Sequence, residues 1–226
     1  MTTEVKVINL GGVNCYLLGS SDSFVLVDTG IANKRSQLVK ELENAGCRPG
    51  HLKLIVLTHG DIDHVANAAY LRDRYAASIA MHLDDAGMVE KGDMSWNRKA
   101  KPDQISFIGR MVIALGTVAT FFAGSNNFEQ FKPDIYLTDG QSLSEYGLDA
   151  SVIHIPGHSK GSIGILTANG DLFCGDLLWN MRKPGPHFIV VDLDDYTASV
   201  QKLKSLDIRT IYPGHGSPFA REQFFK

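Results

Sequence analysis

The sequence is poor in cysteine and has no block of basic residues. Its three cysteines, Cys15, Cys47 and Cys174, are an odd number at long spacings, which fits neither a disulfide framework nor a Cys-x-x-Cys metal knuckle. Lys and Arg number 22 against 25 Asp and Glu, so the electrostatic footprint of a nucleic-acid-binding protein is missing. Reduced cysteines and the polar residues 1–6, which do not resemble a secretory signal, predict a cytoplasmic protein.

Long hydrophobic runs are also missing. The longest apolar stretch runs from Met111 to Gly124 and follows Arg110, whereas a helix that spans a bilayer needs about 20 apolar residues. We therefore expect no transmembrane segment and a buried or interfacial helix at this position. A chain of 226 residues buries enough surface to fold as one domain, predicted here over residues 1–226, without a disulfide or a structural metal.

Two strand-turn-strand units of similar pattern are separated by more than a hundred residues. The first occupies residues 14–30 and passes through Asp28, and the second occupies residues 162–175 and leads into Asp176. Such a repeat predicts an α/β protein of two pseudo-symmetric halves, each with a sheet and outer helices. The second half is expected to begin near Ile135. Further strands are predicted at 5–10, 52–57, 78–81, 151–155 and 208–212, and helices at 33–46 and 65–77. A last helix, capped by Asp194 or Asp195, is predicted to run to Leu206.

Residues 84–133 do not repeat and are predicted to form a helical insertion, or lid, within the domain. Apolar side chains in it suit an acyl or other apolar part of a small-molecule substrate, and they suit a core or a homodimer interface equally well. These side chains are Phe107, Met111, Leu115, Phe121, Phe122 and Phe128.

Four histidines, His59, His64, His158 and His215, lie in loops beside Gly or Asp just after predicted strands. The run from His59 to His64 also holds Asp61 and Asp63, so four imidazole or carboxylate groups of the kind that bind divalent transition metals fall within six residues. The alternative is a polar turn in which Asp61 or Asp63 caps the following helix. Neither a P-loop nor a serine elbow is present to indicate a different chemistry.

Taken in order, the runs Thr58–His64 (THGDIDH), Pro156–Ser162 (PGHSKGS), Cys174–Asp176 (CGD) and Tyr212–His215 (YPGH) resemble the motif series of the metallo-β-lactamase superfamily. The upstream run Val25–Gly30 (VLVDTG) matches as well. The resemblance implies a four-layer αββα sandwich with a metal centre, usually dinuclear, at one edge between the sheets. By position it assigns His59, Asp61 and His158 to one ion, Asp63, His64 and His215 to the other, and Asp176 to a bridge between them.

Asp61 departs from the commonest pattern of this superfamily, which has a second histidine there. Aspartate still binds divalent ions through oxygen, so we expect two divalent ions, zinc first, with iron or manganese as alternatives. A carboxylate in this position also resembles the flavodiiron reductases, which carry glutamate. Two other readings therefore stay open: an iron-containing redox protein, di-iron or mononuclear, and an inactive metal-binding scaffold.

The expected activity is metal-dependent hydrolysis of an ester, lactone, thioester or β-lactam-like amide by a metal-held hydroxide. Asp63 is the predicted catalytic residue, because besides binding metal it can accept a hydrogen bond from the hydroxide and orient it. Lys160 and His187 are predicted substrate contacts, although Lys160 can equally face water. Asp28 is expected to be a structural hydrogen-bond acceptor near the site. His154 is expected to be a core residue or to support the site from outside; for His82 such a supporting role is the lesser alternative.

Overall fold

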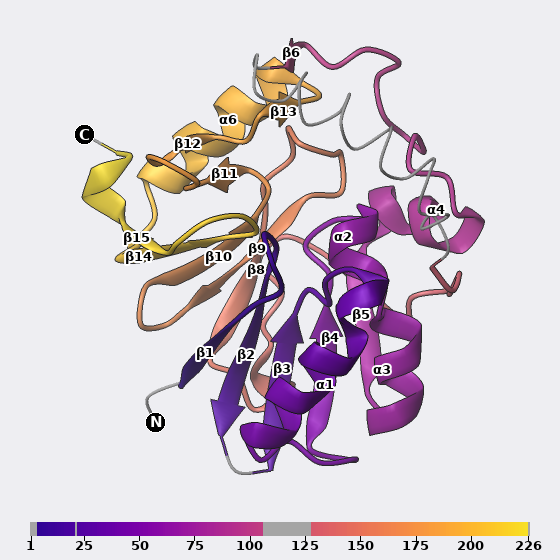
Figure 1. Cartoon of the computed structure of the whole chain (residues 1–226). Coiled ribbons are helices and arrows are strands. Elements are labelled where there is room, and N and C mark those ends of the chain that lie inside the picture. The colour runs from indigo at the N-terminus through magenta and orange to yellow at the C-terminus, as the bar shows by residue number, and fades with distance from the viewer. Residues whose placement is uncertain (1–3, 21, 106–127, 226) are drawn as a thin grey trace.

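The computed structural model describes residues 4–20, 22–105 and 128–225. Within these residues the longer strands form two sheets, one of six strands and one of five (Figure 1). The first sheet has the order β1-β2-β3-β4-β5-β7. Its strands are β1 (Val5–Asn9), β2 (Asn14–Ser20), β3 (Ser23–Val27), β4 (Leu52–Val56), β5 (Ser78–His82) and β7 (Ile135–Leu137).

The second sheet has the order β15-β14-β10-β9-β8. Its strands are β8 (Ala150–His154), β9 (Ile163–Thr167), β10 (Asp171–Gly175), β14 (Thr210–Pro213) and β15 (Phe219–Ala220). Two short antiparallel pairs lie beyond it: β11 (Leu178–Trp179) with β12 (Gly185–Pro186), and β13 (Ile189–Val190) with β6 (Gln104–Ile105).

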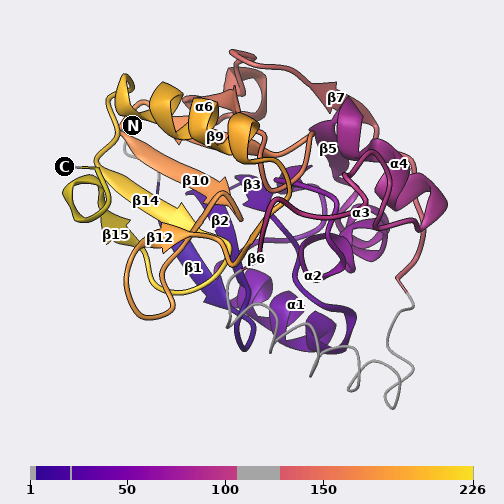
Figure 2. The same ribbon diagram turned by 90° about the horizontal axis from the view of Figure 1, so that it is seen from above.

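Helices cover the outer face of each sheet, which gives four layers. The helices are α1 (Arg35–Asn44), α2 (Ile62–Val65), α3 (Ala68–Tyr75), α4 (Leu83–Lys91) and α6 (Leu193–Lys204), with 3-10 turns η1 (Ala32–Lys34), η2 (Ser144–Tyr146) and η3 (Arg221–Gln223). Figure 2 shows α6, the second sheet, the first sheet and α1 stacked in this order. The predicted αββα sandwich is therefore confirmed.

Alternation along the central strands explains why the layers stack. In β3, Phe24 and Leu26 pack in the core beneath α1 and α3, whereas Val25 and Val27 pack in the core between the sheets. A strand with both faces buried reads as a continuous apolar run for this reason. On β10, Phe173 faces the core between the sheets, and its neighbours Leu172 and Cys174 face α6.

The repeat seen in the sequence corresponds to equivalent strand pairings. The pair β2/β3 is antiparallel and β3 then pairs with β4 in parallel; likewise β9/β10 is antiparallel and β10 pairs with β14 in parallel. Asp28 follows the end of β3 and Asp176 follows the end of β10. The two pseudo-symmetric halves thus each place an aspartate at the same edge of the sandwich.

Three predicted boundaries are wrong. Ile135 does not open the second half, because β7 pairs in parallel with β5 and completes the first sheet. The helix predicted at 65–77 is interrupted at Asn67, whose buried side chain donates to the carbonyls of Thr29 and Ile31 and pins the break. The last long helix is capped by Asp192, rather than by Asp194 or Asp195, since its side chain accepts from the backbone N–H groups of both.

The described parts of the insertion pack onto the rest of the fold. Helix α4 packs against β5, β6 pairs with β13, and Phe131 and Phe128 lie in or against the core beneath α1 and α3. The apolar stretch 111–124, with Phe107, Met111, Leu115, Phe121 and Phe122, lies outside the described residues, so its role as a lid stays a prediction. Among the described helices, none has the length and hydrophobicity required to cross a bilayer.

Candidate metal centre

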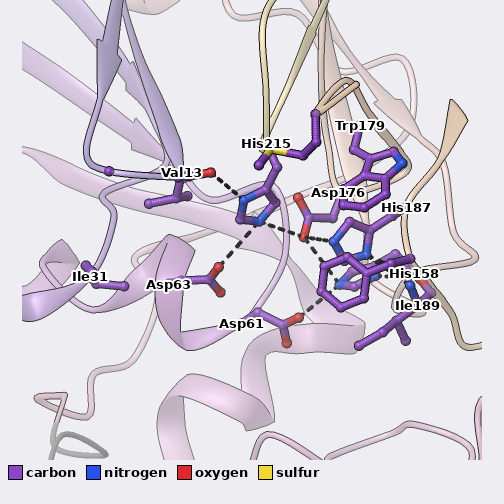
Figure 3. A pocket seen from close by; sticks show the side chains of 14 residues that line it. Val13, Ile31, Asp61, Asp63, His158, Asp176, Trp179, His187, Ile189 and His215 are labelled. Atoms are coloured by element: carbon purple, nitrogen blue, oxygen red, sulfur yellow. Dashed lines mark hydrogen bonds and ion pairs between the residues drawn. The ribbon is translucent and has the colours of Figure 1, made fainter. Parts of the chain in front are cut away.

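The candidate residues converge on one edge of the sandwich from loops that follow strand ends. After β4, the loop carries His59 and Asp61 and the adjoining helix α2 carries Asp63 and His64; the loop after β8 carries His158, and those after β10 and β14 carry Asp176 and His215. Figure 3 shows these loops around a single cavity. The cavity has a volume of about 450 Å³ and a polar floor, and its apolar wall includes Val13, Ile31, Trp179, Phe188 and Ile189.

Asp176 is the centre of the cluster. It is 4% exposed, and its Oδ2 lies 3.3 Å from Nε2 of His215 and 3.9 Å from Nε2 of both His59 and His158. Its Oδ1 lies 3.5 Å from Nε2 of His64. Two groups of mutually close ligand atoms contain the motif residues, and Asp176 touches both: His59 with His158 and Asp176, and Asp63 with His64 and His215. A third group joins Asp176 and His215 to His187.

Each of these histidines is oriented through its other ring nitrogen. The bonded pairs are His59 Nδ1 with Thr58 Oγ1 (2.9 Å), His64 Nδ1 with Asp28 Oδ2 (2.8 Å), His158 Nδ1 with the Ile189 carbonyl (3.1 Å) and His215 Nδ1 with the Gly12 carbonyl (2.7 Å). Such bonds fix the tautomer and turn Nε2 toward the shared carboxylate, as in histidines that bind metals.

Asp28 is the hydrogen-bond acceptor that the sequence predicts. It is buried, adopts a left-handed conformation with a φ of 60°, and accepts from the backbone N–H and the hydroxyl of Thr58. Because the Thr58 hydroxyl gives its proton to Asp28, it is left to accept from His59. One carboxylate therefore orients two histidines, His64 directly and His59 through Thr58.

The donor set fits divalent cations. Within the described part of the chain, Nε2 of His59 and His64 and Oδ1 of Asp176 are buried without a hydrogen-bond partner, a condition that costs about 1–3 kcal/mol for each atom. Burial opposes ionisation of Asp176, but His215, His187 and His64 hold its pKa well below the usual range. Burial alone would lower the pKa of His215, whereas Asp176 and Asp63 raise it to about 10. The carboxylates thus favour positive charge at this position.

Asp61 reaches the cluster but is shared with an arginine. Its Oδ2 lies 2.9 Å from Nε2 of His158 and 3.5 Å from Nε2 of His59, while its Oδ1 lies 2.7 Å from Nη2 of Arg98. Burial disfavours the charged form of Asp61, but Arg98 and the two histidines hold its pKa well below the usual range. The sequence analysis did not identify Arg98, because it stands in a polar stretch of the insertion without periodicity or motif.

Asp85 is a second residue that the sequence analysis missed. Its carboxylate is 1% exposed and accepts from the backbone N–H of Gly60 (3.0 Å), the hydroxyl of Ser159 (2.6 Å) and the backbone N–H of Gly161 (2.8 Å). It therefore joins the loop of His59 to the loop of His158. In the sequence, Asp84 and Asp85 look alike at the start of a helix, and only the fold separates them.

The two predicted substrate contacts differ in position. His187 lines the cavity and is buried, and burial in the first place lowers its pKa to about 3. Lys160 lies outside the cavity with an exposed side chain, because the turn is fixed by the bond from the next residue's N–H to Asp85 and by the Lys160 carbonyl accepting from His154. His82 stacks on His154 at the junction of the sheets, with ring centroids 4.3 Å apart.

Comparison with known proteins gives relatives that match most of the chain. Acyl-coenzyme A thioesterase MBLAC2 of Bos taurus is 24% identical over 94% of this chain and 76% of its own length. Hydroxyacylglutathione hydrolase GloC of Haemophilus influenzae is 27% identical over 96% of this chain and 92% of its own length. The similarity therefore extends well beyond the histidine motifs.

Solved structures of similar fold cover nearly the whole chain. The metallo-beta-lactamase family protein TTHA1429 of Thermus thermophilus has a TM-score of 0.72 at 23% identity, over 98% of this chain and 75% of its own. TTHA1623, solved in a di-iron-bound form, has a TM-score of 0.66 at 22% identity, over 96% and 94% of the two chains. The sequence model of the metallo-beta-lactamase superfamily matches residues 8–215. With the fold and the ordered motifs, this match shows that the chain belongs to the metallo-beta-lactamase superfamily.

Proposed function

We propose that this hydrolase cleaves an acyl thioester or a related carboxylic ester with the help of two divalent metal ions, which we expect to be zinc. The observation that carries the proposal is the shared position of Asp176. This one buried carboxylate faces both groups of ligands below a cavity with an apolar wall. In the proposed site, His59, Asp61 and His158 would hold one ion, Asp63, His64 and His215 would hold the other, and Asp176 would be shared by the two.

A divalent ion bound there would polarise the scissile carbonyl and lower the pKa of the attacking water. Asp63 is the candidate for the catalytic proton acceptor, because its side chain is 34% exposed and lines the cavity. Its Oδ2 lies 3.4 Å from Nε2 of His215, which fixes the carboxylate while leaving it open to a water on the cavity side. A carboxylate in this position can orient the water and accept its proton.

The shape of the cavity favours an acyl substrate of small-molecule size. Its volume of about 450 Å³ falls within the range of about 300–1,000 Å³ that is usual for such sites. Trp179 and Phe188 form a tilted aromatic pair on one side, with ring centroids 5.4 Å apart, and Val13 and Ile31 line it as well. The names of MBLAC2 and GloC, an acyl-coenzyme A thioesterase and a hydroxyacylglutathione hydrolase, support an acyl group on a thiol carrier.

The test is a substrate panel on protein of known metal content. Acyl-coenzyme A thioesters, S-acylglutathiones, aryl esters, lactones and a cephalosporin are compared, with thiol release or ring opening as the readout. We expect thioesters to turn over fastest. Asp63→Ala should lower kcat by about 100-fold to 10,000-fold, while Asp194→Ala, an exposed aspartate on α6, should leave it unchanged. Fully metal-loaded protein that hydrolyses none of these compounds would contradict the proposal.

Iron-based redox chemistry is the second candidate. Three carboxylates reach this centre, from Asp61, Asp63 and Asp176. A site with carboxylate ligands suits iron and manganese better than a site with imidazole ligands alone. TTHA1623, a similar fold, was solved with two iron ions. Elemental analysis of protein purified without added metal or chelator separates the candidates: zinc supports hydrolysis, whereas iron with reductant-dependent oxygen consumption supports the redox alternative. Metal without any turnover indicates an inactive scaffold.

The remaining parts of the proposal concern the surroundings of the site. We propose a cytoplasmic protein in which the insertion at 84–133 either covers the cavity or joins two copies of the chain. Cell fractionation tests the location, and light scattering of the purified protein tests the homodimer.

A further inference from the structure

His187 is a buried histidine that the proposed ligand set does not use. It lies in the loop between β12 and β13 and is 5% exposed. Its Nε2 is 3.3 Å from Oδ2 of Asp176, the same distance as Nε2 of His215. Figure 3 shows its ring beside Asp176 and His158, at the floor of the cavity. A fifth imidazole therefore faces the central carboxylate.

The orientation of His187 is that of the four other histidines. Its Nδ1 lies 3.4 Å from both the carbonyl oxygen and the backbone nitrogen of Ile189, and the same carbonyl lies 3.1 Å from Nδ1 of His158. Its Nε2 is buried and has no hydrogen-bond partner in the described part of the chain. The backbone of Ile189 thus holds both imidazoles at their Nδ1 atoms, which leaves both Nε2 atoms turned toward Asp176, as in histidines that bind metals.

The environment of Asp61 explains why a further imidazole ligand is useful in this cluster. The superfamily pattern places a histidine at position 61, but here the aspartate shares its charge with Arg98. His187 and His158 lie edge to face with ring centroids 4.7 Å apart. A different segment of the chain therefore adds an imidazole to the same cluster, on the side of Asp176 and His215 rather than at position 61.

We infer that His187 is a metal ligand, which binds a divalent transition ion together with the Oδ2 atom of Asp176. This inference rests on the proposed metal centre. The ligand atoms of Asp176, His187 and His215 lie within 4.8 Å of one another, which is close enough for one ion to contact all three. Packing against Phe188, with ring centroids 4.0 Å apart, holds the ring in place. His187 is then a ligand, in place of the substrate contact expected from the sequence.

Zinc affinity and coordination test this role without relying on activity. His187→Gln keeps a polar side chain of similar size but removes the imidazole. His51→Gln is the matched control, because His51 is a half-buried histidine just before β4, at the end of that strand opposite to His59. We expect competition with a chromophoric chelator to show at least one zinc ion bound about 100-fold more weakly in His187→Gln, the upper end of the effect of losing a supporting residue. The His51 variant should bind as the wild type does.

X-ray absorption at the zinc edge gives the second readout. The number of imidazoles per protein should fall from five to four in His187→Gln, and His187→Cys, which keeps a zinc-binding side chain, should recover most of the affinity. Thermal unfolding of the metal-free proteins shows whether each variant is folded.

The outcomes separate this inference from the proposed function. Unchanged zinc affinity and an unchanged imidazole count in folded His187→Gln would overturn the inference, and a raised KM in that case would identify His187 as a substrate contact. A wild-type protein that binds no zinc, iron or manganese would instead overturn the proposed function.

Discussion

Replacement of Asp85 by alanine should loosen both histidine loops at once. The carboxylate is 1% exposed and accepts three hydrogen bonds, from Gly60, Ser159 and Gly161. A hydrogen bond to a charged group contributes about 1.5–3 kcal/mol, but such bonds are not additive. Breaking a buried charged network by removing one partner costs about 3–5 kcal/mol. We therefore expect the free energy of unfolding to fall by about that amount in Asp85→Ala.

The corresponding change in melting temperature is measurable. For a domain of this size, 1 kcal/mol shifts Tm by about 2–4 °C, so Asp85→Ala should melt about 6–20 °C below the wild type. Its zinc affinity should also fall by about 10-fold to 100-fold, since the side chain fixes residues next to the candidate ligands His59 and His158.

Asp84→Ala is the matched control for this experiment. Asp84 is the preceding residue, in the same first turn of α4, and its side chain is 46% exposed. An acidic residue at an exposed helix N-terminus contributes about 0.3–1 kcal/mol, so Tm should change by no more than about 4 °C. Equal effects of the two substitutions, or an Asp85→Ala protein that melts with the wild type, would refute the reasoning that the buried carboxylate joins the loops.

Three further predictions follow from the same geometry. Arg98→Met removes the cation beside Asp61, so zinc affinity should rise while the metal-free protein loses stability. Lys101→Met removes the same charge at an exposed position, and neither its zinc affinity nor its Tm should change in the same titration and melting experiment. Removal of metal by a chelator should lower Tm by about 5–11 °C for each ion present at about 100 times its Kd, because binding at that excess contributes about 2.7 kcal/mol, and added zinc should restore it; an unchanged Tm would show that no tight site exists. Gly161→Ala places a Cβ 2.7 Å from Cγ of Asp85 and should lower Tm by several degrees. Gly185→Ala is the control, because its Cβ would lie 4.0 Å from the nearest atom, Nε1 of Trp179, and its Tm should not fall in the same melting experiment.

The sequence predicts the fold well where local patterns and long-range structure agree. The two strand-turn-strand units, each leading to an aspartate, are recognisable because both faces of their strands are buried and their turns carry Gly and polar residues. The short strand β7 has only three residues, which is too few for a periodic pattern. Its place in the first sheet depends on its pairing with β5, which no local feature of the sequence shows. Asn67 interrupts a helix through bonds to carbonyls more than thirty residues away.

Within the site, the motif residues were predictable and their supporting residues were not. The histidines and aspartates of the strand-end loops stand in dense polar motifs, so the sequence alone indicated that they belong together. Arg98 reaches the site through its ion pair with Asp61, and Asp85 through three hydrogen bonds from two loops. Neither has a neighbour in sequence that points to the site. The position of His187 likewise follows from the loop between β12 and β13, whose path depends on the packing of Trp179 and Phe188 around it.

The candidate ligands are divided between the two halves of the molecule, so the metal centre lies at the interface between these halves. In the first half, the loop after β4 and helix α2 provide His59, Asp61, Asp63 and His64, and loops of the second half provide His158, Asp176, His187 and His215. A chain cut between β7 and β8 would leave each fragment with an incomplete set of ligands. Zinc would then promote reassembly of the two fragments, and tight zinc binding would show that the fragments had associated, independently of catalysis.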